Sequence, residues 1–259
     1  FVFNGLRLPV VSLLLFIVVK LRGGSISIQR IHLPLMSTVA FFGMFLNTVT
    51  AIWGLSLTTA TNMGIITSTT PLFILIVSFA ARTEHISKKL VTGLFIGICG
   101  VILINYRQGE LAWNIGDILV MLSCLCFAVY AVFGKKIVDI YSAILTTAWM
   151  FLFAGIYQFP LFIYQLRDQV WNTIPIINWI NLGFGAFGSF FAANVLFFYA
   201  IRKIGAVRAG VYLNLQPIFT LIFAYLIMGE TVTLMKVTGL VIILIGIGIT
   251  KIPPRMRPV

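Results

Sequence analysis

The chain has 259 residues, of which 60% are hydrophobic and 9% are charged, and its formal net charge is +12. Soluble domains are typically about 45–50% apolar and about 25% charged, so this composition excludes an ordinary globular protein and indicates an integral membrane protein. Positive charge also suits nucleic-acid binding, but these basic residues occur in short groups at the ends of apolar runs. Charge that sets orientation in a membrane is therefore the favoured interpretation, and no nucleic-acid partner is expected.

Nine apolar runs are candidates for membrane-spanning helices, because a span needs about 20 largely apolar residues. In chain order they cover 1–21, 34–56, 60–81, 89–106, 115–137, 141–165, 179–201, 206–228 and 234–252. Alternating the sides of these spans places fourteen of the eighteen Lys and Arg residues on one side. Since Lys and Arg are retained in the cytoplasm, we predict a multi-pass protein of the cell membrane with a cytoplasmic carboxyl terminus.

Two segments, 60–105 and 206–251, are copies of one sequence laid 146 positions apart, with thirteen identical positions. The turn at 82–89 in the first copy carries three basic residues if His85 is set aside, whereas the matching turn at 228–235 carries none. The turn that precedes each copy shows the reverse distribution. Opposite charge in matching turns predicts opposite orientation, so the fold class is all-α with an inverted repeat, as in many secondary transporters.

The two predicted repeats are residues 1–106 and 107–259. Each inverted unit must contain an odd number of spans, and the second unit holds five whereas the first holds four. We therefore expect that a first helix upstream of Phe1 is missing, and that it would restore two units of five.

Pro71 and Pro217 lie at matching places inside the third and eighth spans, where proline leaves the carbonyl four residues earlier unpaired. Thr67, Thr70 and their neighbours could compensate in the first copy, and Asn214 or Gln216 in the second. One interpretation is a kink needed only for packing. The other is that paired broken helices flank a substrate site.

Uncharged polar residues recur at helical spacing on several spans, where they need a partner or water. Hydrogen bonding between helices explains any one of them, whereas a shared polar cavity explains their recurrence. The candidate substrate-binding residues are Asn47, Thr50, Trp53, Thr67, Thr70, Tyr130, Asn194, Tyr212, Asn214 and Gln216.

The six acidic residues lie at or near predicted span ends, and no carboxylate or histidine is expected deep in the membrane. A membrane enzyme needs titratable or metal-binding groups that converge in a pocket, and the sequence contains no such set. We predict no catalytic residue, no metal site and no cofactor. A secondary transporter is favoured, and a non-transporting receptor or assembly subunit is the alternative.

Two features are open to more than one interpretation. Arg7, in the first span, could extend to the membrane interface or meet an anionic group of a substrate, and the interface is favoured. Glycines at 93, 97 and 100 and at 239, 246 and 248 predict close helix packing. That packing could join the two halves of one chain or two chains of a homodimer.

The chain resembles the EamA family of the drug/metabolite transporter superfamily. The likeness is carried by Leu213-Asn214-Leu215-Gln216-Pro217-Ile218-Phe219 with Glu230 and Gly239-Leu240, and again by Thr70-Pro71-Leu72-Phe73 with Glu84 and Gly93. Arg7 matches an arginine that such proteins carry early in their second helix. The resemblance implies ten helices in two inverted units of five, a central cavity, and movement of small organic metabolites.

We expect this chain to depart from the family in lacking the first helix, and it has Thr83 before Glu84 where the second copy has Gly229. Members of the family differ in substrate, so the resemblance names none. The aromatic content of 14%, with phenylalanines around Asn194 and Trp53 near Asn47, suggests a pocket for amphipathic solutes such as amino acids.

Overall fold

A computed structural model describes residues 2–84, 86–105, 114–167, 175–228 and 234–250. Within these ranges the chain is helical and has no strand, which confirms the all-α prediction there. Among the described residues, five helical stretches are long and apolar enough to cross a membrane, by length and composition. The number of spans remains a prediction. The second turn of the repeat, at 229–233, and the carboxyl-terminal residues 251–259 lie outside the described ranges.

The chain divides into two compact units, and each takes helices from both halves of the sequence. Unit 1 comprises residues 1–49 and 129–205, and unit 2 comprises residues 50–128 and 206–259. Two helices continue from one unit into the other, α3 (Asn47–Leu57) and α7 (Ile115–Val138). These units are defined by packing and are distinct from the repeats predicted from the sequence.

Unit 1 is built around a pair of neighbouring helices, α1 and α8. Its elements are α1 (Val2–Leu21), η1 (Arg30–His32), α2 (Leu33–Ala40), η2 (Phe41–Leu46), α8 (Ala143–Leu166), α9 (Ile176–Phe184), η4 (Gly185–Ala192) and α10 (Ala193–Ile204). A side chain at Gly5 would meet Phe162, and Ser12 donates a hydrogen bond to the carbonyl of Ala148 at 2.9 Å. The start of α1 therefore lies beside the end of α8, and the two helices are antiparallel.

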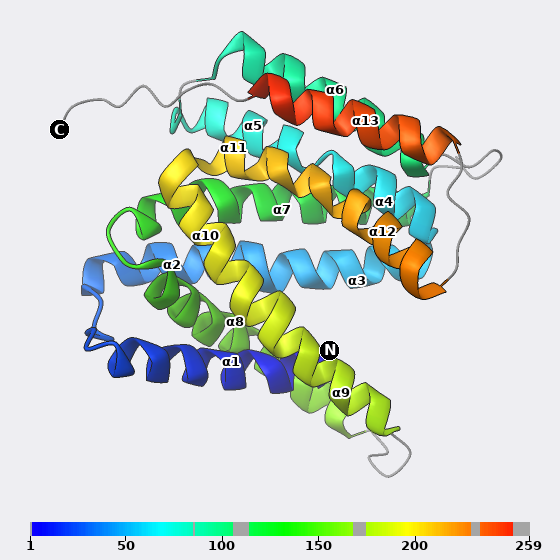
Figure 1. Cartoon of the computed structure of the whole chain (residues 1–259). Coiled ribbons are helices and arrows are strands. Elements are labelled where there is room, and N and C mark those ends of the chain that lie inside the picture. Colours follow the sequence, from blue (N-terminus) through cyan, green and yellow to red (C-terminus); the bar gives the residue numbers. More distant parts are fainter. Residues whose placement is uncertain (1, 85, 106–113, 168–174, 229–233, 251–259) are drawn as a thin grey trace. The chain divides into compact units, whose positions relative to one another are not determined.

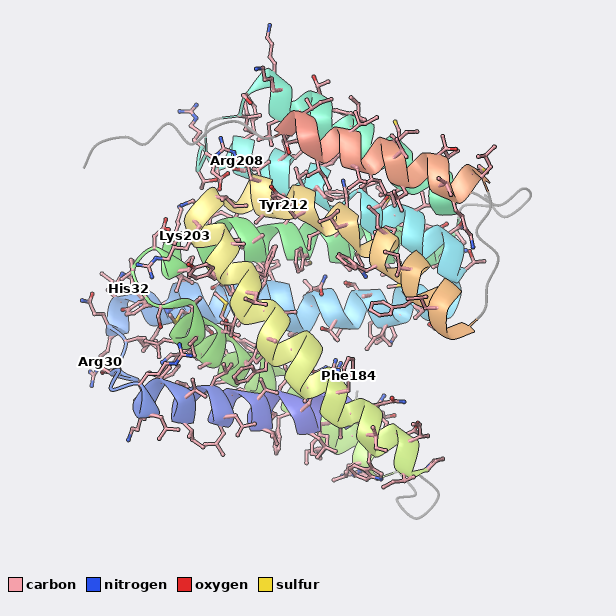
Figure 2. All side chains as sticks on the ribbon, in the orientation of Figure 1. Arg30, His32, Phe184, Lys203, Arg208 and Tyr212 are labelled. Atoms are coloured by element: carbon pink, nitrogen blue, oxygen red, sulfur yellow. The ribbon has the colours of Figure 1, made fainter. Side chains whose placement is uncertain are left out.

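One end of unit 1 carries several basic side chains. Arg30 and His32 lie in the connection between α1 and α2, and Lys203 lies in the last turn of α10 (Figure 2). Gly205 ends α10 with a φ of 90°, a conformation that favours glycine, and the chain turns there into the next helix.

Unit 2 contains the two copies of the duplicated segment. Its elements are α4 (Ala60–Ser68), α5 (Thr70–Ala80), α6 (Lys88–Asn105), α11 (Ala206–Val211), η5 (Tyr212–Leu215), α12 (Gln216–Met228) and α13 (Leu234–Thr250). The last helices of the two copies, α6 and α13, lie side by side (Figure 1). A Cβ at Gly93 would lie 2.5 Å from the carbonyl oxygen of Gly246, and one at Gly100 would lie 2.6 Å from that of Gly239. The start of each helix faces the end of the other, so the pair is antiparallel.

These contacts show where the predicted glycine packing occurs. Gly93 and Gly100 meet Gly246 and Gly239 of the same chain, so the close approach joins two copies of the segment and needs no second chain. For Gly248 the prediction is wrong, because no described atom outside its own helical neighbourhood lies within 4 Å of a Cβ placed there. The homodimer remains a prediction.

Irregular backbone recurs at matching positions of the two halves. Segments η2 and η4 are π-helical, and the 146-residue spacing places η2 onto the last six residues of η4. In the duplicated segment, α4 stops at Ser68 just before Pro71, and η5 is a 3₁₀ turn just before Pro217. Segments of π-helix are rare and are frequent at functional sites.

Candidate functional site

In unit 1, Tyr130 connects three elements around a fully buried ring. Its hydroxyl donates a hydrogen bond to Oδ1 of Asn194 on α10 at 3.0 Å, and its ring meets Phe198 edge-on, with centroids 4.9 Å apart. On the other side, a Cβ at Gly43 of η2 would lie 2.3 Å from the Tyr130 ring. The structure thus brings two predicted site residues, Tyr130 and Asn194, into direct contact. Asn47 lies one turn beyond Gly43, as the first residue of α3.

In unit 2, the break before Pro71 is held together by side-chain hydroxyls. The Thr70 hydroxyl donates to the carbonyl of Thr67 at 2.6 Å, the carbonyl that Pro71 leaves without its helical donor. The Thr67 hydroxyl in turn donates to the carbonyl of Met63 at 2.8 Å. Both predicted residues therefore satisfy the local backbone.

The second break is arranged differently. The backbone N–H of Gln216 donates to the carbonyl of Leu213 in a 3₁₀ turn, and the Asn214 side chain makes no hydrogen bond to this carbonyl. The compensation expected from Asn214 is therefore not found. As a result, the side chain of Asn214 is left for another partner.

Asn214 is a buried amide with unusual surroundings. It is 2% exposed, and neither its Oδ1 nor its Nδ2 has a hydrogen-bond partner among the described residues. Its Nδ2 lies 2.9 Å from where a Cβ of Gly97 would be, so the glycine on α6 leaves room for it. Leaving buried polar atoms unpaired costs about 1–3 kcal/mol, and such groups are rare in native proteins. An amide in this state is suited to a ligand or a water molecule.

The other predicted residues differ in exposure. Thr50 is buried, whereas Trp53 and Tyr212 are 54% and 41% exposed and Gln216 is also exposed. Tyr212 lies on the helical stretch that links α11 and α12 (Figure 2). The predicted set is therefore divided between unit 1 and unit 2. Within the described parts of the chain, no group of three or more His, Cys, Asp or Glu side chains could hold a metal ion.

Comparison with known proteins assigns the family. The sequence profile of the EamA-like transporter family matches residues 1–106 and, separately, residues 114–251. The chain belongs to the EamA-like transporter family. It is thus a membrane protein of a transporter family, as its resemblance to the family implied.

The relatives of this EamA protein are also described as transporters. It is 24% identical to the uncharacterized transporter YetK of Bacillus subtilis (strain 168), over 98% of this chain and 79% of YetK. It is 30% identical to an uncharacterized transporter of Archaeoglobus fulgidus, over 71% of this chain and 64% of the relative. A crystal structure with 14% identity superimposes with a TM-score of 0.80, over 96% of this chain and 85% of the other, which supports the fold.

Three structural features of this EamA chain were not predicted from its sequence. Asp117 is buried in the first turn of α7, where it accepts hydrogen bonds from the Thr58 hydroxyl and, at 2.9 Å, from the N–H of Asn114. Asn114 accepts in return from the N–H of Asp117 at 3.1 Å. This reciprocal pair is a capping box, so a structural role accounts for the buried carboxylate.

The second feature is Glu84, whose carboxylate accepts hydrogen bonds from the N–H groups of Ala206 and, at 3.4 Å, Val207 at the start of α11. The turn of one copy thus caps the first helix of the other.

The third feature is a cluster of Arg7, Phe190 and Gln158 in unit 1. Gln158 is a polar residue in the middle of an apolar run, and this was the signal that could have identified it.

Proposed function

We propose that this EamA protein is a secondary transporter that moves small organic metabolites across the cell membrane by alternating access. In this proposal, residues 1–106 and 107–259 form two inverted repeats, and the solute binds between broken helices near the middle of the membrane. The carboxyl terminus is cytoplasmic. Amphipathic solutes such as amino acids are the expected substrate class.

The observation that carries the proposal is the recurrence of irregular backbone at the same places in both halves. One pair is η2 with η4, and the other is the break before Pro71 with the 3₁₀ turn before Pro217. Both halves therefore place broken helices at matching positions. Transporters use discontinuous helices because they expose backbone and side-chain polar groups to a solute.

Two further observations support the inverted arrangement and the orientation. Helices α6 and α13 end the two copies and are antiparallel, as inversion requires of matching elements. Arg30 and Lys203 lie at one end of unit 1, the end that would face the cytoplasm.

The residues proposed to contact the solute are Tyr130 and Asn194 within unit 1 and, taken separately, Asn214 and Gln216 within unit 2. Transport is tested in liposomes that contain the purified protein, with labelled amino acids and related metabolites, with and without a proton gradient. We expect at least one solute to move faster than in protein-free liposomes. If none does, the transporter proposal is wrong.

The site is tested separately with the double substitution of Asn214 and Gln216 by Leu. Each lost hydrogen bond is worth about 1 kcal/mol, so the rate at low solute concentration should fall about 30-fold. Thr92→Leu, an exposed polar-to-apolar change on α6, is the matched control and should keep the wild-type rate. Equal rates for the double variant and the control would remove these two residues from the site.

A further inference from the structure

Arg7 is a cationic side chain directed to the middle of a long helical stretch. Its guanidinium carbon lies 3.6 Å from the centroid of the Phe190 ring. Phe190 is the middle residue of the continuous helical stretch 176–204. At a rise of about 1.5 Å per residue, Phe190 lies roughly 20 Å along the helix from residue 176. A side chain that extended to the interface would end near a helix terminus instead. The half-buried Arg7 side chain therefore packs against η4 of unit 1, and its position at the membrane interface stays a prediction.

No negative charge accompanies this guanidinium in the described parts of the chain. Arg7 makes no hydrogen bond or ion pair there, and its Nε is buried without an acceptor. The ion pair that the described residues do contain is Lys135–Asp139, at the end of α7. An unpaired charge within a membrane span is costly, and by default it indicates a functional site.

Gln158 on α8 is a second polar group without a partner. Its side chain is fully buried, and both Nε2 and Oε1 lack a hydrogen-bond partner among the described residues. Two helical turns earlier on the same face of α8, the ring of Phe151 packs against Phe190, with centroids 5.7 Å apart. The face of α8 that carries Gln158 is therefore the face directed toward η4, as is the guanidinium of Arg7.

Arg7 and Gln158 also lie at the same depth in unit 1. Pro9 of α1 packs against Gly155 of α8, since a Cβ at Gly155 would lie 3.5 Å from the Pro9 ring. The two helices are antiparallel, so Arg7, two positions before Pro9, lies level with Gln158, three positions after Gly155. Gly185 leaves room at this level, because a Cβ there would lie 3.3 Å from Nη1 of Arg7.

We propose that Arg7 and Gln158 form a subsite for the carboxylate of a small organic monocarboxylate, a step that rests on the proposed transport function. The planar guanidinium donates two parallel hydrogen bonds to the carboxylate, and Nε2 of Gln158 donates a third. Oε1 of Gln158 accepts from an N–H or O–H group on the solute. The single cation matches a monoanion, and Phe190 and Phe151 provide an apolar surface for the rest of the solute.

The test measures thermal unfolding of the purified full chain with pairs of ligands that differ in charge but hardly in shape. The pairs are phenylacetate with phenylacetamide and hexanoate with hexanamide. We expect at least one acid to raise the Tm of the wild-type protein more than its amide does. If neither acid does so, the proposal is overturned.

Substitutions assign the effect to this cluster. Arg7→Met should weaken binding of the acid roughly 30-fold or more, and Gln158→Leu should weaken it less. Arg22→Met, at an exposed position just after the end of α1, is the control and should keep the preference for acids. A merely structural Arg7 would be needed for stability, whereas we expect the ligand-free Arg7→Met protein to have a Tm no lower than the wild type. A lower Tm, or a preference for acids that persists in Arg7→Met, overturns the proposal.

Arg7→Lys is a second test, because it keeps the charge and loses the planar fork. An unchanged preference for acids in Arg7→Lys overturns the proposal. Flux in liposomes separates this subsite from the transport function. Flux of solutes without a preference for carboxylates contradicts the subsite alone, and carboxylate binding without flux of any solute contradicts the transport function alone.

Discussion

The antiparallel contact between α6 and α13 predicts the effect of a single methyl group. In Gly93→Ala the new Cβ would lie 2.5 Å from the carbonyl oxygen of Gly246 and 2.6 Å from Cγ2 of Thr250. An ordinary contact between such atoms is about 3.5 Å, so the helices must separate by about 1 Å along much of their length. The obstacle is the backbone of a packed helix, which cannot turn aside as a flexible side chain can.

The magnitude follows from two opposing effects. Overpacking of this kind costs about 1–3 kcal/mol, whereas replacing Gly by Ala inside a helix gains about 0.5–1 kcal/mol. The net loss for Gly93→Ala is about 1–2 kcal/mol. For a chain of this size, that loss lowers the Tm by about 3–6 °C. The measurement is thermal unfolding of the purified protein, followed by tryptophan fluorescence at one fixed scan rate because unfolding of membrane proteins is often irreversible.

Gly248→Ala is the matched control, since Gly248 lies on α13 two residues from Gly246 and is exposed. It makes the same chemical change and gains the same helix propensity, but meets no described neighbour within 4 Å. Its Tm should equal or exceed that of the wild type. A Gly93→Ala protein as stable as Gly248→Ala would show that the two helices are not packed as described.

Two other predictions concern orientation and capping. Cysteines introduced at Ser87, just before α6, and at Leu234, the first residue of α13, should react with a membrane-impermeant thiol reagent from opposite sides of the membrane. Reaction of both from one side would contradict the inverted repeat. Glu84→Ala should lower stability by about 1 kcal/mol because the first N–H groups of α11 lose their acceptor, whereas Glu84→Gln keeps an acceptor oxygen and should lose less. Equal Tm values for Glu84→Ala and the wild type would rule out this cap.

The sequence predicted features that depend on chain-wide patterns. The helical fold class follows from composition and apolar runs, and the resemblance of the duplicated motif to the EamA family implied the family. The position of the breaks followed from proline chemistry, because Pro71 and Pro217 cannot donate to the preceding turn. These inferences need no knowledge of which helix is the neighbour.

Features that depend on a specific neighbour could not be predicted in this way. The π-helical segments η2 and η4 leave no proline or other marker in the sequence. Helical spacing indicates which face holds Asn214, but not that Gly97 of α6 would leave room for it. In the same way, the direction of Arg7 depends on Phe190, a residue 183 positions away that no local pattern connects to it.

The glycine contacts also bear on how the duplicated segment is arranged. Under the 146-residue spacing, Gly93 corresponds to Gly239 and Gly100 corresponds to Gly246. The contact of Gly93 with Gly246 therefore has the contact of Gly239 with Gly100 as its counterpart, and both are present. Reciprocal contacts of this kind arise when equivalent surfaces pack about a two-fold axis. Two helices related by that axis must run in opposite directions when it lies perpendicular to them, as an axis in the membrane plane does. Gly100→Ala should therefore destabilise the protein about as much as Gly93→Ala, because each substitution opens one half of the same symmetric contact.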